Sequence, residues 1–300
     1  MLSNEIQTSL KKLLSDHLKI PLPPIRFEGI SGGSINQAFR MIAGQGRQYF
    51  LKLNSATDYP GLFVKEKNGL EFLDKPEASQ GRTIIRVPAV IGCGVINTYQ
   101  FLVLEWIERG TKTRKFWNEF GEQLAVLHKV SRHSFVFHED NYMGALTQRN
   151  DLNPEWISFF IQNRLQPQVE LANLKNRLEA KHITGFETIY ARLPEIFNKE
   201  PSSLLHGDLW SGNFMCDESN RPVLIDPAVY FGHRSVDLGM STLFGGFDNE
   251  FYEAYNYNYP FPTNYKEQWE VANLYPLLIH LNLFGKTYLP QIESIIKKYQ

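Results

Sequence analysis

Residues 204–228 read LLHGDLWSGNFMCDESNRPVLIDPA, in which short apolar runs flank a polar loop. Asp208 stands five residues before Asn213, and Asp226 stands thirteen residues after Asn213, at the end of the apolar run PVLI. Short apolar runs bounded by turn-forming residues are typical of buried strands. We therefore expect a polar loop and a strand end that bring these three side chains together.

This set of side chains matches the requirements of phosphoryl transfer. A carboxylate must accept the proton of the acceptor hydroxyl, and oxygen ligands from an asparagine and a second aspartate must hold Mg²⁺ against the nucleotide phosphates. The spacing of Asp208, Asn213 and Asp226 is that of a catalytic loop followed by a metal-binding strand end. A nucleotide-dependent transferase is the resulting hypothesis.

The N-terminal part supplies two further elements of such a site. The segment GISGGS, residues 29–34, can bring backbone N–H groups close to phosphate oxygens, although a plain turn would read the same way. Lys52 lies inside a strand pattern, and Glu66 shares a helix stripe with Phe63 and Leu70. A carboxylate on an apolar stripe needs a cation, so we expect Lys52 to pair with Glu66. An exposed glutamate on a helix face is the alternative.

The hydrophobic pattern divides the chain into two parts. Residues 1–106 begin with an amphipathic helix that stops before residue 21 and continue as strands with one helix over 63–73; residues 107–300 are mainly helical. Residues 44–46 form a turn that predicts an antiparallel hairpin. We expect an α+β fold with a smaller N-terminal lobe and a larger C-terminal lobe. The predicted strands are 37–43, 48–53, 83–87 and 100–106.

Composition excludes several classes of protein. The chain has 300 residues, with 31 Lys and Arg against 32 Asp and Glu, so it lacks the cationic excess of a nucleic-acid-binding protein. Its two cysteines, Cys93 and Cys216, indicate neither a disulfide framework nor a cysteine-based zinc site, which fits a reducing compartment. Without a long apolar segment, no membrane association is predicted, and we expect a cytoplasmic protein.

The sequence resembles the fructosamine kinase (ketosamine 3-kinase) family, within the aminoglycoside phosphotransferase and choline kinase group of protein-kinase-like folds. The motifs that carry the resemblance extend over nearly the whole chain and are GGSINQAF, VLEWIE, DNYMGALTQRN, HGDLWSGN, IDPAVYFGHRSVDLGM and YPLLIHLNLFG. The resemblance implies a bilobal fold and ATP-dependent phosphorylation of the C3 hydroxyl of a ketosamine. A ribulosamine or a fructosamine fits equally, either free or protein-bound.

The resemblance also implies a role for individual residues. Asp208 would be the catalytic base, Asn213 and Asp226 would hold Mg²⁺, and Lys52 with Glu66 would hold the ATP phosphates. The acceptor would stack on Trp210, for which a core position is the alternative. ATP would further contact the glycine loop and the hinge between the lobes, at Gly32, Gly33, Ser34, Glu105, Trp106 and Ile107.

Other functions stay open at this level. Within the same group, the acceptor could be an aminoglycoside or choline. A metallohydrolase could use His206, His233 and Asp237 as metal ligands, and a catalytically inactive nucleotide-binding module could keep the same fold. Pro227 and Ala228 stand where protein kinases carry Phe-Gly, which favours a small-molecule acceptor.

Overall fold

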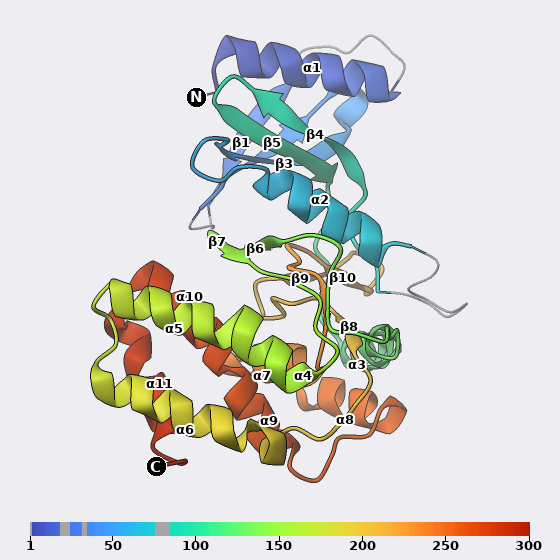
Figure 1. Ribbon diagram of the computed structural model, residues 1–300. Coiled ribbons are helices and arrows are strands. Elements are labelled where there is room, and N and C mark those ends of the chain that lie inside the picture. Colours follow the sequence, from blue (N-terminus) through green and yellow to red (C-terminus); the bar gives the residue numbers. More distant parts are fainter. Residues whose placement is uncertain (1, 19–24, 32–34, 76–84) are drawn as a thin grey trace.

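The computed structural model describes residues 2–18, 25–31, 35–75 and 85–300, so the predicted glycine-loop residues Gly32, Gly33 and Ser34 lie outside the described residues. Figure 1 shows a sheet with helix α1 on its outer side at one end of the molecule, and a larger group of helices at the other end. The combination is the expected α+β architecture. Among the helices of the described ranges, none combines the length and apolarity needed to cross a bilayer.

The N-terminal lobe is built on a five-stranded antiparallel sheet in the order β1-β2-β3-β5-β4. The turn at η1 (Gly44–Gly46) joins β2 to β3, as predicted. Along β3, alternate residues Tyr49, Leu51 and Leu53 are buried on one face, which leaves Lys52 on the other. The strands are β1 Arg26–Ile30, β2 Gln37–Ile42, β3 Gln48–Ser55, β4 Val90–Ile96 and β5 Tyr99–Glu105.

Two helices cover the two faces of this sheet. Helix α1 (Asn4–Leu18) buries Ile6, Leu10 and Leu14 in the same cluster as Leu51, so its apolar stripe packs on its own lobe as expected. Helix α2 (Leu62–Leu73) lies on the opposite face, toward the C-terminal lobe (Figure 1).

One strand prediction was wrong and two strands were not predicted. Strand β1 was not predicted, and Gly29 and Ile30 of the glycine-rich segment belong to it. The run 83–87 is not a strand over its described residues, 85–87, where Arg86 forms only an isolated bridge to Val223. Strand β4 was missed because its sequence, VIGCGVI, contains two glycines that lower strand propensity, whereas pairing with β5 supplies the missing stability.

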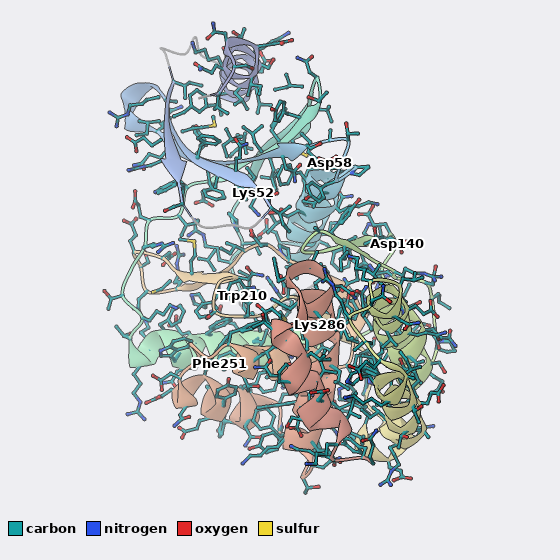
Figure 2. The ribbon with its side chains drawn as sticks, turned by 90° about the vertical axis from the view of Figure 1, so that its left-hand side faces the viewer. Lys52, Asp58, Asp140, Trp210, Phe251 and Lys286 are labelled. Atoms are coloured by element: carbon teal, nitrogen blue, oxygen red, sulfur yellow. The ribbon has the colours of Figure 1, made fainter. Side chains whose placement is uncertain are left out.

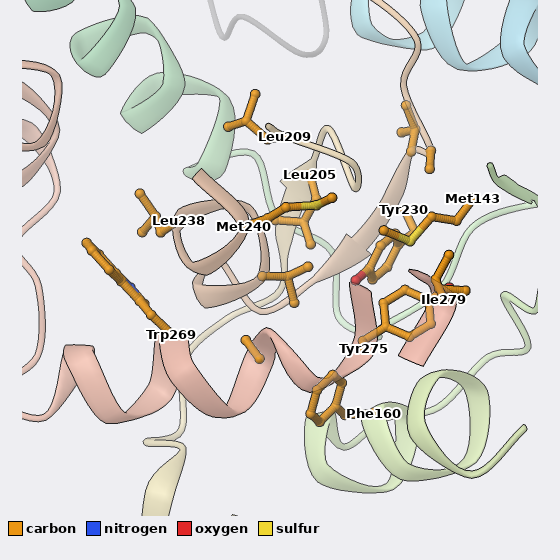
Figure 3. Packing of buried hydrophobic residues seen from close by; sticks show 14 of the residues in the cluster. Met143, Phe160, Leu205, Leu209, Tyr230, Leu238, Met240, Trp269, Tyr275 and Ile279 are labelled. Carbon is orange, nitrogen blue, oxygen red and sulfur yellow. The ribbon is translucent and has the colours of Figure 1, made fainter. Parts of the chain in front are cut away.

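The C-terminal lobe is mainly helical and also contains three short antiparallel strand pairs among the described residues, β6–β7, β8–β11 and β9–β10. Its core gathers aromatic and aliphatic side chains, and Figure 3 shows Leu205, Tyr230 and Tyr275 among them. The strands are β6 Asn141–Met143, β7 Leu146–Gln148, β8 Ser203–Leu205, β9 Phe214–Cys216, β10 Pro222–Leu224 and β11 Tyr230–Gly232. The helices are α3 Arg114–His128, α4 Trp156–Phe159, the π-helix η3 Phe160–Leu165, α5 Gln166–Leu174, α6 Ala180–Ile196, α7 Ser235–Leu243, α8 Asn249–Asn258, α9 Tyr265–Ala272, α10 Leu274–Phe284, η4 Lys286–Tyr288 and α11 Leu289–Ile296.

A buried histidine in this lobe makes stability depend on pH. His233 is 1% exposed, and its Nδ1 lies 2.8 Å from the hydroxyl of Ser235. Burial lowers the pKa of His233 from 6.5 to about 4. Between these values the unfolded chain binds a proton that the folded chain does not, so this residue stabilises the fold above pH 6.5 and loses that contribution as the pH falls toward 4.

We therefore expect His233→Asn to be destabilised relative to the wild type at pH 8, and the difference to shrink by on the order of 2 kcal/mol at pH 5. Asparagine keeps an acceptor near Ser235 but does not titrate. Urea unfolding of both proteins at the two pH values measures the difference. An equal difference at both values would show that His233 is not held neutral.

Candidate active site

A cleft of about 200 Å³ lies between the sheet and the C-terminal lobe. Figure 2 shows Lys52 on the upper side of this region and Trp210 on the lower side. All six described residues predicted for catalysis, metal, phosphates and acceptor line the cleft, and they are Lys52, Glu66, Asp208, Trp210, Asn213 and Asp226.

Asp237 of α7 stabilises the loop that carries Asp208 by accepting two backbone hydrogen bonds. The fully buried carboxylate of Asp237 accepts the backbone N–H groups of His206, at 2.7 Å, and Gly207, at 2.9 Å. The ring of His206 spans the loop, because its Nε2 lies 2.9 Å from the carbonyl of Ile225 and its Nδ1 accepts the N–H of Asp208 at 3.2 Å. Both residues therefore position the loop.

Gly207 allows the loop to approach the next strand. Its φ is +85°, and a Cβ atom there would lie 2.0 Å from the carbonyl oxygen of Ala228. That oxygen lies in the segment between Asp226 and β11, so the absence of a side chain at Gly207 lets the loop of Asp208 approach the segment of Asp226.

Asn213 orients the carboxylate of Asp208. Its amide nitrogen donates to Asp208 Oδ2, at 2.8 Å, and to the Asp208 carbonyl, at 2.9 Å. No hydrogen bond from the described residues reaches the Oδ1 atom of Asn213. Burial raises the pKa of Asp208 to about 7, although the Asn213 hydrogen bond acts in the opposite direction. A carboxylate with this pKa is a stronger proton acceptor than an exposed aspartate.

Asp226 lies beside Asn213 because the two strand ends pair. The N–H of Ile225 donates to the carbonyl of Asn213 at 3.0 Å, which continues the β9–β10 ladder up to Asp226. Asp226 has a φ of +55°, in the left-handed region. Aspartate adopts this region more readily than most residues other than glycine, so the conformation is compatible with the position.

Lys52 connects the two lobes at this point. Its ammonium lies 2.8 Å from Glu66 Oε1 and 2.5 Å from Asp226 Oδ1. Burial lowers the pKa of Lys52, but the charges of Asp226 and Glu66 outweigh it and raise the pKa overall, so the group is a cation. The expected pairing with Glu66 is present, and the additional contact to Asp226 was not predicted.

The predicted hinge residues lie outside the cleft lining. The carboxylate of Glu105 binds Arg86 and accepts the N–H of Ala89 at 3.2 Å, while Trp106 stacks under Arg40, 4.9 Å from its ring centroid. Ile107 is buried. These side chains are therefore engaged elsewhere, and the backbone N–H of Glu105 is engaged as well, because it donates to the carbonyl of Ala89 at 2.8 Å.

Sequence reasoning missed the part of the cleft formed by the β6–β7 hairpin. Asn141 donates to the carbonyl of Val229, and Lys65 of α2 pairs with Glu139 at 2.6 Å, so the hairpin contacts both lobes. The motif DNYMGALTQRN contributes to the family resemblance, but its polar residues carry no spacing typical of a site. The lining residues not predicted are Ile35, Asn36, Leu62, Lys65, Asn141, Tyr142, Gly144, Pro227 and Ala228.

The oxygen atoms that the cleft offers as metal ligands suit a hard cation. The Oδ1 atom of Asn213 and the partly exposed carboxylate of Asp226 are neighbouring oxygen donors, which Mg²⁺ prefers. By contrast, the described residues contain no group of three or more His, Cys, Asp or Glu side chains that could hold a metal ion. His233 contacts Ser235 rather than His206, so the geometry does not support the metallohydrolase hypothesis.

Comparisons with known proteins show the family to which the chain belongs. The family model described as fructosamine kinase matches residues 6–300. The chain belongs to the fructosamine kinase family. It is 36% identical over 301 residues to the "probable ketoamine kinase" of Enterococcus faecium, covering 98% of this chain and 100% of that one. It is 37% identical over 275 residues to the chloroplastic protein-ribulosamine 3-kinase of Arabidopsis thaliana, covering 90% and 81%.

Solved structures agree on the fold of this fructosamine kinase family member. One is a crystal structure from Haemophilus somnus that is provisionally named a fructosamine-3-kinase. It aligns with a TM-score of 0.85 at 25% identity, covering 97% of this chain and 96% of that chain. The LicA structure in complex with AMP aligns with a TM-score of 0.60 at 14% identity, covering 99% and 100%, which shows the shared fold. The chain is thus an enzyme, an ATP-dependent phosphotransferase with a kinase-like fold.

Proposed function

We propose that this enzyme transfers the γ-phosphoryl group of ATP to the C3 hydroxyl of a ketosamine, with Mg²⁺ as the metal. The observation that carries the proposal is the position of the Lys52 ammonium between Glu66 and Asp226, next to the Asp208–Asn213 pair, in a chain of this family. Free thiols at Cys93 and Cys216 fit a cytoplasmic location.

In the proposed reaction, Asp208 accepts the proton of the acceptor hydroxyl. The hydroxyl oxygen then forms a bond to the γ-phosphorus as the bond from that phosphorus to the ADP oxygen breaks. Asn213 keeps Asp208 oriented through its amide nitrogen. Asn213 and Asp226 would hold Mg²⁺, which when bound neutralises charge on the phosphates.

The remaining proposed contacts to ATP involve residues of both lobes, which we assign to 1–106 and 107–300. Lys52 would bind the α- and β-phosphates, with Glu66 holding it in place. We assign the backbone of the loop at Gly32, Gly33 and Ser34 to the phosphates, and the backbone of residues 105–107 to adenine.

The acceptor would lie between Asp208 and Trp210. Trp210 lines the cleft and is 36% exposed, so part of its indole ring is available to contact a sugar. The position of Trp210 two residues after Asp208 brings a stacking surface next to the proton acceptor.

An ADP-release screen tests the proposal. Ribulosamines, fructosamines, aminoglycosides and choline are supplied with ATP and Mg²⁺, and the phosphorylated position is determined by NMR. We expect ADP only with ketosamines, a phosphate on C3, and no turnover after chelation of the metal. Turnover of an aminoglycoside or choline in preference to every ketosamine would contradict the proposed acceptor.

A further inference from the structure

Five aromatic side chains form a continuous surface that begins in the cleft and leads out of it. Trp210 lines the cleft, and its ring centroid lies 5.8 Å from that of Phe244, which lies 5.0 Å from His280. The His280 ring lies 5.5 Å from Phe284 and 4.9 Å from Tyr288. We call these five side chains the aromatic ledge.

The ledge is open to solvent and uncharged. Trp210, Phe244 and Phe284 are 36%, 38% and 49% exposed. His280 lies within the ledge, its Nδ1 is 2.7 Å from the carbonyl of Pro276, and burial lowers its pKa, so the ring is neutral at pH 7. An exposed apolar surface that continues a binding cleft is typical of a ligand-contacting site.

The fold holds the ledge against the catalytic loop and the cleft. Gly246, two residues after Phe244, has a φ of +89°, and a Cβ atom there would lie 2.6 Å from the Cβ of Ser211 in the catalytic loop. On the other side, a Cβ atom on the cleft residue Gly144 would lie 3.0 Å from Leu283 Cδ1 of α10. Phe244 and helix α10 therefore have a defined position relative to the cleft. Trp210 lies on the side of the C-terminal lobe that faces Lys52 (Figure 2).

We propose that the ledge side chains beyond Trp210 bind the amine-derived part of the acceptor, and that the enzyme prefers ketosamines whose amine carries an aromatic or branched apolar group. This inference rests on the proposed function. With the sugar hydroxyl at Asp208, the rest of the acceptor passes Trp210. The apolar surface that continues from there is formed by Phe244 and Phe284.

The test compares kcat/KM for two ribulosamines, one made from benzylamine and one from methylamine. Burial of a phenyl group against aromatic faces predicts a ratio of roughly ten in favour of the benzylamine adduct. Phe284→Ala should bring this ratio toward one, and Phe284→Tyr should restore it. The control is Tyr257→Ala on α8, a side chain that is 88% exposed and not part of the ledge, which should leave the ratio unchanged.

The outcomes separate this inference from the function on which it rests. Failure of every ketosamine to release ADP would overturn both. Good turnover of both adducts with a ratio near one would overturn the ledge alone. Faster turnover of a glycine-flanked ribulosyl-lysine peptide than of the benzylamine adduct would indicate that the ledge binds polypeptide, and would overturn the proposal. A dimer of the wild type that Phe284→Ala dissociates would indicate that the ledge is a dimer interface, and would also overturn it.

Discussion

Asp208→Asn is expected to lower kcat by about 10²–10⁴-fold while ATP binding is retained. Asparagine preserves the size of the side chain but cannot accept the proton of the acceptor hydroxyl. Since burial raises the pKa of this partly buried carboxylate to about 7, its replacement by a neutral amide should not unfold the protein. Steady-state ADP release gives kcat, and calorimetric titration with ATP gives the affinity.

Asp151→Asn provides a matched control for this variant. Asp151 is 59% exposed in its side chain and pairs with Arg149 away from the cleft, so the same chemical change there should leave kcat unchanged. If Asp208→Asn retained turnover within tenfold of the wild type, another group would have to be the proton acceptor.

Lys52→Met is the second change with a large expected effect. It removes the cation shared by Glu66 and Asp226 and so leaves the buried Glu66 unpaired. Breaking one partner of a buried ion pair costs about 3–5 kcal/mol of unfolding free energy. ATP positioning is lost as well, so we expect a higher KM for ATP and a kcat at least about 100-fold lower.

A double variant separates the two effects of this change. In Lys52→Met/Glu66→Leu no carboxylate at position 66 stays unpaired, so stability in urea unfolding should recover while kcat stays low. Lys67→Met, on the same helix α2 but in an exposed pair with Glu71, is the control and should change neither quantity. Recovery of activity together with stability would show that Lys52 acts only through folding.

Local sequence signals were sufficient for the elements that carry the site. The 3-4-3 spacing around Glu66 predicted α2, the alternation along β3 placed Lys52 opposite Leu51, and the polar loop before PVLI predicted where Asp208 and Asp226 would lie. These features depend on side-chain periodicity and on neighbours within a few residues, which is why they can be read without a fold.

Strand β4 and the β6–β7 hairpin could not be predicted in the same way. Gly92 and Gly94 make β4 a poor strand by composition, and it forms because β5 pairs with it. Asn141 gains its place in the cleft from its hydrogen bond to Val229, 88 residues away in the chain. Such contacts have no periodic signature.

The amino-acid sequence by itself determined the α+β class, the family and the chemical identity of the groups at the site, because those depend on residue type and order. Tertiary structure decided that Lys52 also reaches Asp226, that Asp237 supports the loop of Asp208, and that a row of aromatic rings extends from Trp210. The physical reason is that each of these contacts joins segments that are far apart in the chain and meet only in the folded protein, across the two lobes for Lys52 and Asp226 and within the C-terminal lobe for the other two.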